Sequence, residues 1–343
     1  MNIPKIRNME EFASFSGISR PTISRFFHDP DSVRPATREK LEQALSQCEY
    51  RPNIFAINQN RKLTKNLGIV VPYLADPFFA EIARRIENLV INAGFRPILL
   101  SSHGDPALEV ANLDSLRSIK PAGVLLAPLG RTSDTDALAK FCSDFPTINF
   151  DANIDGIGDA FIGHDNSHAT KVMVEYLTRS GDAPVFFEML TPPNPNAGKR
   201  RLAYLDSMEE LGLEPHIISI EGEGWELEEI GYKGGLNVLQ KKELSTSTVF
   251  CSNDRLAIGF LAAAFEMGLR VGIDNDSDLR VAGHDNHPFS RFTCPTLTTI
   301  SHNYSEIAKN SVETLMSIIA SENRDLERKT LLFGGELVMR ASA

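Results

Sequence analysis

Acidic, basic and aromatic residues directly follow short apolar runs throughout residues 66–302. If these runs are parallel strands, such residues lie at the carboxyl ends of the strands, where α/β proteins bind ligands. Carboxylates and arginine pair with hydroxyl groups, and an aromatic ring covers the apolar side of a sugar ring, so we predict a site for a small polyol. The candidate ligand contacts are Asp76, Phe79, His103, Asp151, Asp165, Arg200, Trp225, Asn253, Asp285 and His302.

Short apolar runs alternate with amphipathic stretches after Lys65, which predicts an α/β fold with parallel sheets and helices on both faces. The predicted strands are Leu67–Pro72, Pro97–Leu100, Gly123–Ala127, Thr147–Phe150, Val185–Phe187, Ile217–Ile220, Thr248–Cys251 and Leu279–Gly283. The predicted helices include Phe78–Gly94, Ala107–Ile119, His168–Ser180, Lys199–Leu211 and Asp254–Gly268. Two neighbours of the candidate contacts fit structural roles better: Phe78 fits the core, and Asp254 fits a helix N-cap.

Motifs for common α/β chemistries do not occur in this body. No GxGxxG follows a strand, and there is neither a Walker loop nor a GxSxG turn, so dinucleotide binding and hydrolysis lose their main support. No nucleophile stands out with a paired base, so we expect no catalytic residues. We also expect no cofactor.

Charge is distributed unevenly along the chain. Residues 1–65 hold 11 Lys and Arg against 7 Asp and Glu, a net charge of +4, whereas the whole chain has a net charge of −10. A length of 343 residues allows two or three domains, and 42% hydrophobic with 23% charged residues excludes a disordered chain. A small basic region attached to a large acidic one is typical of a nucleic-acid-binding segment joined to a different domain.

The sequence lacks the usual signals of membrane-spanning and secreted proteins. No apolar run approaches the roughly 18–20 residues of a membrane span, and the N-terminus lacks the apolar core of a secretory signal. Cys48, Cys142, Cys251 and Cys294 lie far apart with no CxxC pair, so we expect free buried thiols and neither a zinc site nor disulfides. A cytoplasmic protein without membrane contact is expected.

The basic segment contains signals for two short helices joined by a turn. Asn8 fits an N-cap with Glu11 three residues on, and Gly17 fits the end of this first helix. Ser19 fits the next N-cap, with Pro21 in the first helical turn. A third helix starts after Arg34-Pro35. The pattern predicts an all-α helix-turn-helix region.

The second of these helices has a polar face suited to the DNA major groove. Arg20 and Arg25 can read base edges, because arginine pairs with guanine through two hydrogen bonds. Ser19, Thr22, Ser24 and Arg38 are expected to contact DNA as well, with Thr22, Ser24 and Arg38 on phosphates. The alternative is a three-helix protein-interaction bundle whose arginines are only solvated.

The segment Phe12–Asn53, which ends in YRPN, resembles the headpiece of the LacI/GalR family of bacterial repressors. The resemblance continues to about residue 340 through TREKLEQAL, LGIVVP…DPFFAEI, CSNDRLAIG, VAGHDN and PTLTTI, in family order. It implies a headpiece at 1–53 with Asn53 among its DNA contacts, and a hinge helix at 54–65 that forms on operator DNA. Small and leucine side chains of such a hinge wedge into the minor groove. Ala56 matches the small residue, but Gln59 stands at the leucine position, which puts the wedge in doubt.

For residues 66–343 the resemblance implies a two-lobed body of the periplasmic-binding-protein type (type I), with the effector between the lobes. The first lobe would hold residues 66–166 and 302–330, and the second 167–301 and 331–343. Connections between lobes are expected near Asn166, Thr299–His302 and Lys329–Leu331, so Asp165 and Asn166 could serve a connection as much as a ligand. Phe79, Arg200, Trp225, Asn253, Asp285 and His302 fall on the family's effector-contact positions, and His103 falls where relatives often place a polar contact.

Two histidine clusters, His164–His168 and His284–His287, hold four of the eight histidines. A cleft with His and Asp from both lobes could hold manganese or zinc. Both clusters also follow predicted strands at positions where the family has an Asp at the cleft edge, and we therefore expect no metal.

The leading interpretation is a transcription regulator, in particular a repressor, that binds a palindromic operator as a homodimer. A small metabolite, favoured to be a sugar or sugar derivative, would switch it. The chain has no heptad repeat after the last predicted strand, so a coiled-coil tetramer is not expected. The alternatives are a periplasmic-type solute-binding protein without DNA regulation and, with less support, a sugar-metabolising enzyme.

Overall fold

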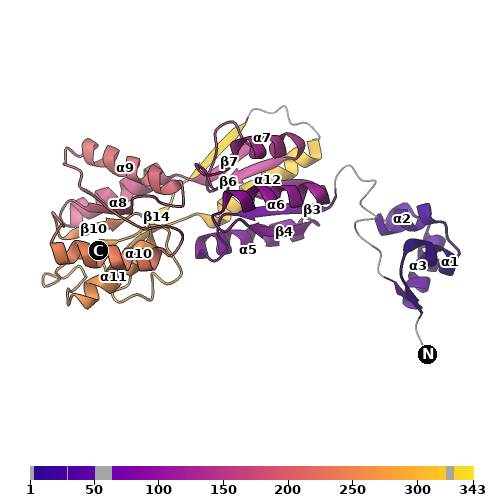
Figure 1. The fold of residues 1–343 in the computed structure, drawn as a ribbon, viewed down its shortest axis with the longest axis horizontal. Coiled ribbons are helices and arrows are strands. Elements are labelled where there is room, and N and C mark those ends of the chain that lie inside the picture. The colour runs from indigo at the N-terminus through magenta and orange to yellow at the C-terminus, as the bar shows by residue number, and fades with distance from the viewer. Residues whose placement is uncertain (1–3, 29, 51–63, 322–327) are drawn as a thin grey trace. The chain divides into compact units, whose positions relative to one another are not determined.

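The computed structural model describes residues 4–28, 30–50, 64–321 and 328–343. The chain divides into two compact units, Met1–Thr64 and Lys65–Ala343, which we call the headpiece and the body (Figure 1). Among the described residues, no helix has the length and hydropathy required to cross a membrane.

The headpiece consists of short helices and one pair of two-residue strands. Its helices are α1 (Met9–Ser16), α2 (Arg20–His28), the 3-10 turn η1 (Pro30–Ser32) and α3 (Pro35–Ser46), and its parallel strands are β1 (Lys5–Ile6) and β2 (Glu49–Tyr50). The side chain of Asn8 caps α1 by accepting a hydrogen bond from the Glu11 amide, and Gly17 ends α1 at φ 68°, as predicted. This conformation favours glycine because it has no Cβ.

Apolar side chains from all three headpiece helices meet in one small core. Phe12, Ile23 and Leu41 are fully buried there. The ring of Phe12 stacks on Tyr50 with 4.6 Å between ring centroids, so β2 is tied to the helices. The predicted helix-turn-helix is confirmed, whereas the β1–β2 pair was not predicted because two residues carry no periodicity.

The first lobe of the body is built on a six-stranded sheet in the order β13-β7-β6-β5-β3-β4, with all neighbouring strands parallel. Its strands are β3 (Asn66–Val71), β4 (Arg96–Ser101), β5 (Gly123–Leu126), β6 (Thr147–Phe150), β7 (Ala160–His164) and β13 (Lys329–Phe333). Alternate side chains of β3 enter different cores: Leu67, Ile69 and Val71 pack with α5 (Pro77–Asn92) and α12 (Tyr304–Ser321). Val70 packs with α6 (Pro106–Ile119) and α7 (Thr135–Asp144) on the opposite face.

The second lobe has a four-stranded parallel sheet in the order β11-β10-β8-β9. Its strands are β8 (Val185–Met189), β9 (Ile217–Ile220), β10 (Thr248–Cys251) and β11 (Arg280–Ala282). One face packs against α8 (Asn166–Ser180) and α9 (Asn196–Glu210), and the other packs against α10 (Leu227–Lys241) and α11 (Asp254–Glu266). The predicted α/β fold class is confirmed in both lobes.

Three segments connect the lobes. The first follows β7; the other two contain β12 (Thr299–Ser301) and β14 (Glu336–Val338), which pair antiparallel. The third connection differs from the expected position at Lys329–Leu331, because all five residues of β13 pair with β7 in the first sheet. The chain therefore leaves the first lobe only after Phe333.

Three of the four cysteines are buried and none of the four forms a disulfide, as predicted, but Cys294 is exposed. Cys294 lies outside the helices and strands of the second lobe, in a segment whose apolar Phe289 and Phe292 are also exposed. Sequence spacing could not show this, because an isolated cysteine carries no pattern of burial.

Candidate functional site

Two adjacent cavities lie between the lobes of the body. The larger has a volume of about 620 Å³ and is lined by residues of both lobes, including His103, Arg131, Arg201 and Trp225. The smaller has about 40 Å³, and its wall includes seven of the ten predicted ligand contacts: Asp76, Phe79, Asp151, Arg200, Trp225, Asn253 and Asp285. The smaller cavity thus brings together residues that are more than 200 positions apart in the chain.

Arg200, in the first turns of α9, is buried and held by three hydrogen bonds. Its Nε donates to Asn166 at 2.9 Å, and its two terminal nitrogens donate to the carbonyl of Ser252 at 2.8 Å and to Asp285 Oδ1 at 2.7 Å. Two guanidinium N–H groups remain after these bonds, because arginine has five. Burial would raise the pKa of Asp285, but Arg200 together with His284 and His302 holds that pKa well below its usual value. Asp285 is therefore a carboxylate at neutral pH.

Asp76 faces Arg255 across the cleft. Asp76 caps α5 by accepting from the Phe78 amide at 2.9 Å, and its other oxygen accepts from Arg255 at 3.1 Å. Arg255 also donates to Glu228 at 2.6 Å. Burial raises the pKa of Asp76, and the charge of Arg255 opposes that shift. We did not predict Arg255, which lies one residue inside α11; its place after the strand-end pair Asn253-Asp254 was the only signal.

Asp151 follows β6 in a left-handed conformation with φ 62°. The side-chain amide of Asn196, at the start of α9 in the other lobe, donates to Asp151 Oδ1 at 2.8 Å. Burial raises the pKa of Asp151 to about 7, although Lys199 and Arg200 act against this. Asp151 can therefore either donate or accept a hydrogen bond near neutral pH. Asn196 is a second contact that the sequence did not reveal.

Aromatic rings close the cleft from both sides. Trp225 stacks on Tyr73 with 5.2 Å between centroids and 12° between planes, and Phe79 meets the same indole edge-on at 6.1 Å. His103 is exposed on the wall of the larger cavity, with its ring 6.2 Å from Tyr73. Phe78 lies in the core, as predicted, and also reaches the wall of the smaller cavity.

The prediction that Asp254 caps α11 is wrong. Asn253 is the cap, since its side chain accepts from the Leu256 amide at 2.8 Å. The Asp254 carboxylate is instead fully buried in the second lobe, where it accepts hydrogen bonds from Ser290, Thr299 and the His287 amide. Burial raises the pKa of Asp254 to about 7. From the sequence alone, either of two adjacent polar residues at a strand end can be the N-cap. Only the residue at which the helix begins decides between them.

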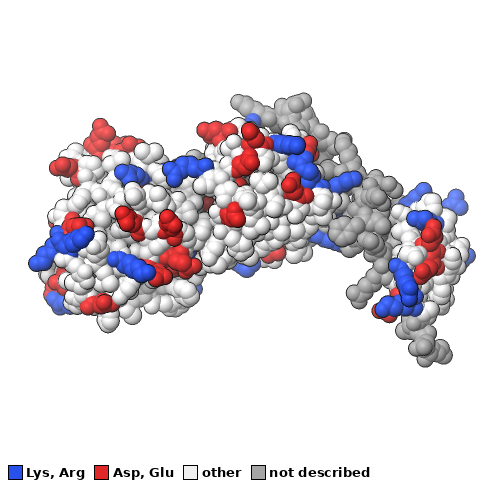
Figure 2. All heavy atoms as spheres, in the orientation of Figure 1, with Lys and Arg blue, Asp and Glu red and all other residues white. Residues whose placement is uncertain are grey.

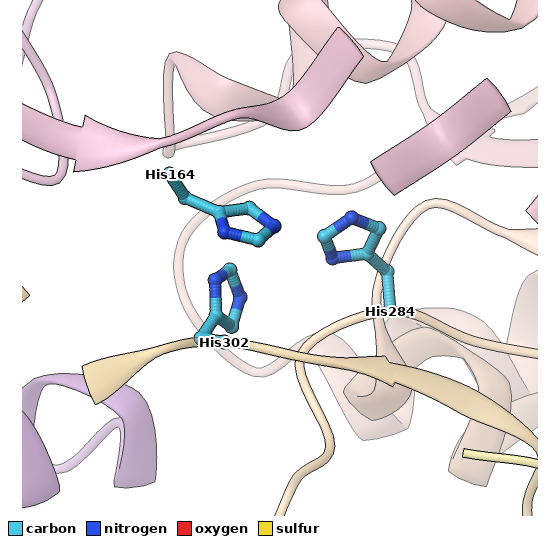
Figure 3. Close-up of side chains that lie close together, drawn as sticks. All are labelled: His164, His284 and His302. Atoms are coloured by element: carbon cyan, nitrogen blue, oxygen red, sulfur yellow. The ribbon is translucent and has the colours of Figure 1, made fainter. Parts of the chain in front are cut away.

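Two predicted ligand contacts do not line these cavities. Asp165 caps α8 by accepting from the His168 amide at 3.0 Å, and His302 lies behind Asp285, to which its Nε2 is 2.7 Å away. His302 instead meets His164 and His284 (Figure 3). Burial lowers the pKa of all three histidines, that of His284 to about 3, so their rings are neutral.

In the headpiece, α2 carries Arg20, Thr22, Ser24 and Arg25 on the sides not buried against α1 and α3. Arg20 pairs with Glu10 at 2.9 Å, and Arg38 pairs with Asp31 and Glu42 at 2.6 and 3.0 Å. The Ser19 hydroxyl lies 2.9 Å from that of Thr22. In Figure 2, basic and acidic side chains are interspersed on the visible face of the headpiece. Asn53, Ala56 and Gln59 lie outside the described residues.

These two sites define a class of protein: a helix-turn-helix DNA-binding unit joined to a two-lobed ligand-binding body. Residues 8–53 match the family described as bacterial regulatory proteins, lacI family, and residues 174–343 match a periplasmic binding protein-like domain. The NTD biosynthesis operon regulator NtdR of Bacillus subtilis (strain 168) is 26% identical over 337 residues, which cover 97% of this chain and 99% of NtdR.

Further matches extend over the same length. The HTH-type transcriptional repressor PurR of Haemophilus influenzae (strain PittEE) is 28% identical over 342 residues, 97% of this chain and 98% of PurR. A crystal structure of the lac repressor dimer bound to operator and the anti-inducer ONPF has the same fold, with a TM-score of 0.82, 23% identity and 98% of each chain covered. The chain belongs to the LacI family of bacterial transcription regulators, and its predicted function as a DNA-binding regulator with a small-metabolite domain is confirmed.

Proposed function

We propose that this regulator is a homodimeric repressor of a palindromic operator and that a sugar or sugar derivative between the lobes switches it. The observation that carries the proposal is the lining of the smaller cavity. Asp76 and Asp151 come from the first lobe, Arg200 and Asp285 come from the second, and the ring of Trp225 completes the wall. Charged planar groups for paired hydroxyls and a ring for the apolar side of a sugar are thus supplied by both lobes.

Binding of such a ligand requires the lobes to move. A volume of about 40 Å³ holds about one water molecule, far less than a sugar. Across this cavity, Arg255 is bonded to Asp76, and Trp225 is stacked on Tyr73. The ligand would enter from the adjoining cavity of about 620 Å³ and exchange these contacts for its own hydroxyl groups. It therefore favours a lobe arrangement different from the described one, which is the condition for a ligand to shift an equilibrium.

The lobe arrangement would control DNA affinity through the segment 54–65, which we propose to be the hinge. A coupling of roughly 1–3 kcal/mol would change operator affinity about 5–150-fold. On the DNA side, we propose that Arg20 and Arg25 read bases and that Ser19, Thr22, Ser24 and Arg38 position the headpiece. Asn53, Ala56 and Gln59 are proposed contacts of the hinge region.

The test begins with a thermal-shift screen of the purified protein against sugars, sugar acids, nucleosides and purines. A ligand that binds only the folded state raises the melting temperature by mass action. Operator affinity is then measured with and without each ligand found. The proposal expects a sugar or sugar acid to change that affinity; a response to purines alone would overturn the assigned ligand class.

Arg200→Ala tests whether the cavity is the effector site. We expect the variant to lose the ligand response and to keep ligand-free operator binding, because Arg200 belongs to the body and not to the headpiece. Arg179→Ala is the matched control, since this arginine of α8 has 79% of its side chain exposed and, within the described part of the chain, pairs only with Glu175 on its own helix. If folded, dimeric Arg200→Ala protein no longer binds the operator at all, effector and DNA functions are not separable as proposed.

A further inference from the structure

Three histidines converge at the junction of the lobes, each from a different connection or strand end (Figure 3). His164 is the last residue of β7 in the first lobe, His284 follows β11 in the second lobe, and His302 follows β12. Their exposed fractions are 3%, 0% and 7%. One ring nitrogen of each can be chosen so that all three lie within 4.8 Å of one another.

Asp285 fixes the orientation of two of these rings. Its Oδ1 lies 2.7 Å from His302 Nε2 and 3.3 Å from His284 Nδ1. Because the carboxylate accepts hydrogen bonds, these two nitrogens carry protons, and the lone pairs are then on His302 Nδ1 and His284 Nε2. A carboxylate behind a histidine is the arrangement that orients imidazole ligands in metal proteins.

The remaining ring nitrogens have no hydrogen-bond partner among the described residues. These are His302 Nδ1, His284 Nε2 and both nitrogens of His164. A buried polar atom without a partner costs about 1–3 kcal/mol, and an ion bound through one nitrogen of each ring would pair three of these four atoms. Figure 3 shows the three rings close together, and their centroids lie 4.1 Å (His164–His302) and 5.4 Å (His284 to each of the others) apart.

We propose that His164, His284 and His302 bind one transition-metal ion, with Zn²⁺ as the favoured occupant. Three imidazole nitrogens suit zinc, cobalt, nickel or copper, whereas magnesium and calcium prefer oxygen ligands. Tetrahedral zinc has ligand nitrogens about 3.4 Å apart, so the rings would draw together on binding. The fourth position is open to water. This replaces the expectation that the chain binds no metal, because the sequence did not reveal that His302 joins the other two.

The proposed ion would tie together the strand end of the first lobe, the second lobe and the β12 connection. It would also lie next to the effector residues, because Asp285 hydrogen-bonds both His302 and Arg200. The metal is therefore expected to hold the lobes in the described arrangement. The proposed metal site does not depend on which effector binds in the cleft.

The experiment uses full-length protein treated with a chelator, dialysed, and titrated with Co²⁺ and then Zn²⁺. We expect one equivalent of Co²⁺ per chain, with the intense visible absorption of a four-coordinate site, and displacement by Zn²⁺. Mg²⁺ should have no effect. The zinc form should melt at a higher temperature than the chelated form, because the ion binds the folded state.

Variants assign the ion to these histidines. His164→Asn and His302→Asn should each weaken Co²⁺ binding at least 100-fold. His168→Asn is the matched control, since His168 is exposed on α8 only four residues from His164, and it should bind as the wild type does. X-ray absorption of the wild-type zinc form, which needs no variant to fold, should count three imidazole ligands.

The proposal fails if the folded wild type binds neither Co²⁺ nor Zn²⁺ stoichiometrically. It also fails if folded His164→Asn and His302→Asn proteins bind as tightly as the wild type, or if X-ray absorption counts fewer than three imidazoles.

Discussion

At the scale of single residues, the headpiece arginines Arg20 and Arg38 differ in how firmly their ion pairs hold them, and this difference bears on DNA binding. The pair Arg20–Glu10 is exposed, with side-chain exposures of 59% and 75%. Such a pair contributes little stability, so Arg20 can leave Glu10 for a base edge. Arg38 bridges Asp31 and Glu42, which fixes its guanidinium at the start of α3.

We expect Arg20→Ala to cost roughly 1–3 kcal/mol on the cognate operator and to relax discrimination at particular base pairs. Arg38→Ala should weaken binding to all sequences about equally, because a phosphate contact carries no sequence information. Selection of binding sites from a random DNA pool measures both effects. An unchanged selection profile for Arg20→Ala would show that α2 is not the recognition helix.

Asp254 makes the stability of the body depend on pH. Its pKa is raised to about 7 in the folded protein, above the unfolded value of about 3.9, so protonation favours folding. This stabilisation is complete below about pH 4 and is lost as pH rises through 7, by an amount on the order of 4 kcal/mol.

Asp254→Asn should therefore reduce the fall in unfolding free energy between pH 5 and pH 8. Asparagine can keep all three hydrogen bonds, with its oxygen accepting from Ser290 and the His287 amide and its nitrogen donating to Thr299. Urea denaturation at both pH values measures the effect, and exposed Asp206→Asn is the control. A pH profile equal to that of the wild type would show that Asp254 does not titrate in this range.

At the scale of elements, α10 and α11 pack backbone against backbone through glycines. A Cβ on Gly259 would lie 2.1 Å from the carbonyl oxygen of Glu228, and one on Gly231 would lie 2.4 Å from that of Leu256. These contacts are with main chain, which cannot move aside as a flexible side chain can. The helices can approach so closely only because both positions lack a side chain.

Gly259→Ala should therefore destabilise the body by more than about 3 kcal/mol, above the usual range for overpacking. Gly198→Ala in α9 is the opposite case, because among the described residues no heavy atom other than nearby backbone of α9 itself lies within 4 Å of the added Cβ. It should stabilise the protein by about 0.5–1 kcal/mol through the better helix propensity of alanine. The measured quantity is the free energy of unfolding in urea. Equal effects of the two substitutions would contradict this packing account.

The strands were predictable where they are buried on both faces of a sheet, as in β3 and β10. In these strands the continuous apolar run in the sequence is itself the signal. The helix α10 was not predicted, because Gly234-Gly235 interrupts its helical pattern. Contacts with α11 and β9 stabilise this helix instead. The strand β13 was missed because four of its five side chains are exposed at the sheet edge. Most residues that line the cleft were predictable, since strand ends meet at one edge of a sheet, but the sequence carries no signal that by itself reveals Arg255 or places His302 beside the other histidines.

At the scale of the whole molecule, we expect a dimer to be the DNA-binding unit. One headpiece offers a single short helix, α2, as its proposed recognition helix, so a two-fold pair on two half-sites is needed for specificity. Light scattering should give twice the chain mass of 37.9 kDa. Insertion of half a helical turn between the half-sites should lower operator affinity at least tenfold. A monomer at concentrations that saturate the operator would contradict the dimer.

Trp225 gives this protein a built-in optical probe. It is the only tryptophan of the chain, it is 7% exposed, and it is stacked on Tyr73 of the other lobe. Light at the long-wavelength edge of tryptophan absorption is not absorbed by tyrosine. Excitation there therefore selects a single fluorophore located where the lobes meet. A ligand that parts Trp225 from Tyr73 should shift the emission wavelength and change its intensity. Stopped-flow fluorescence of the unlabelled protein could then time the opening of the cleft and compare it with the rate of operator release.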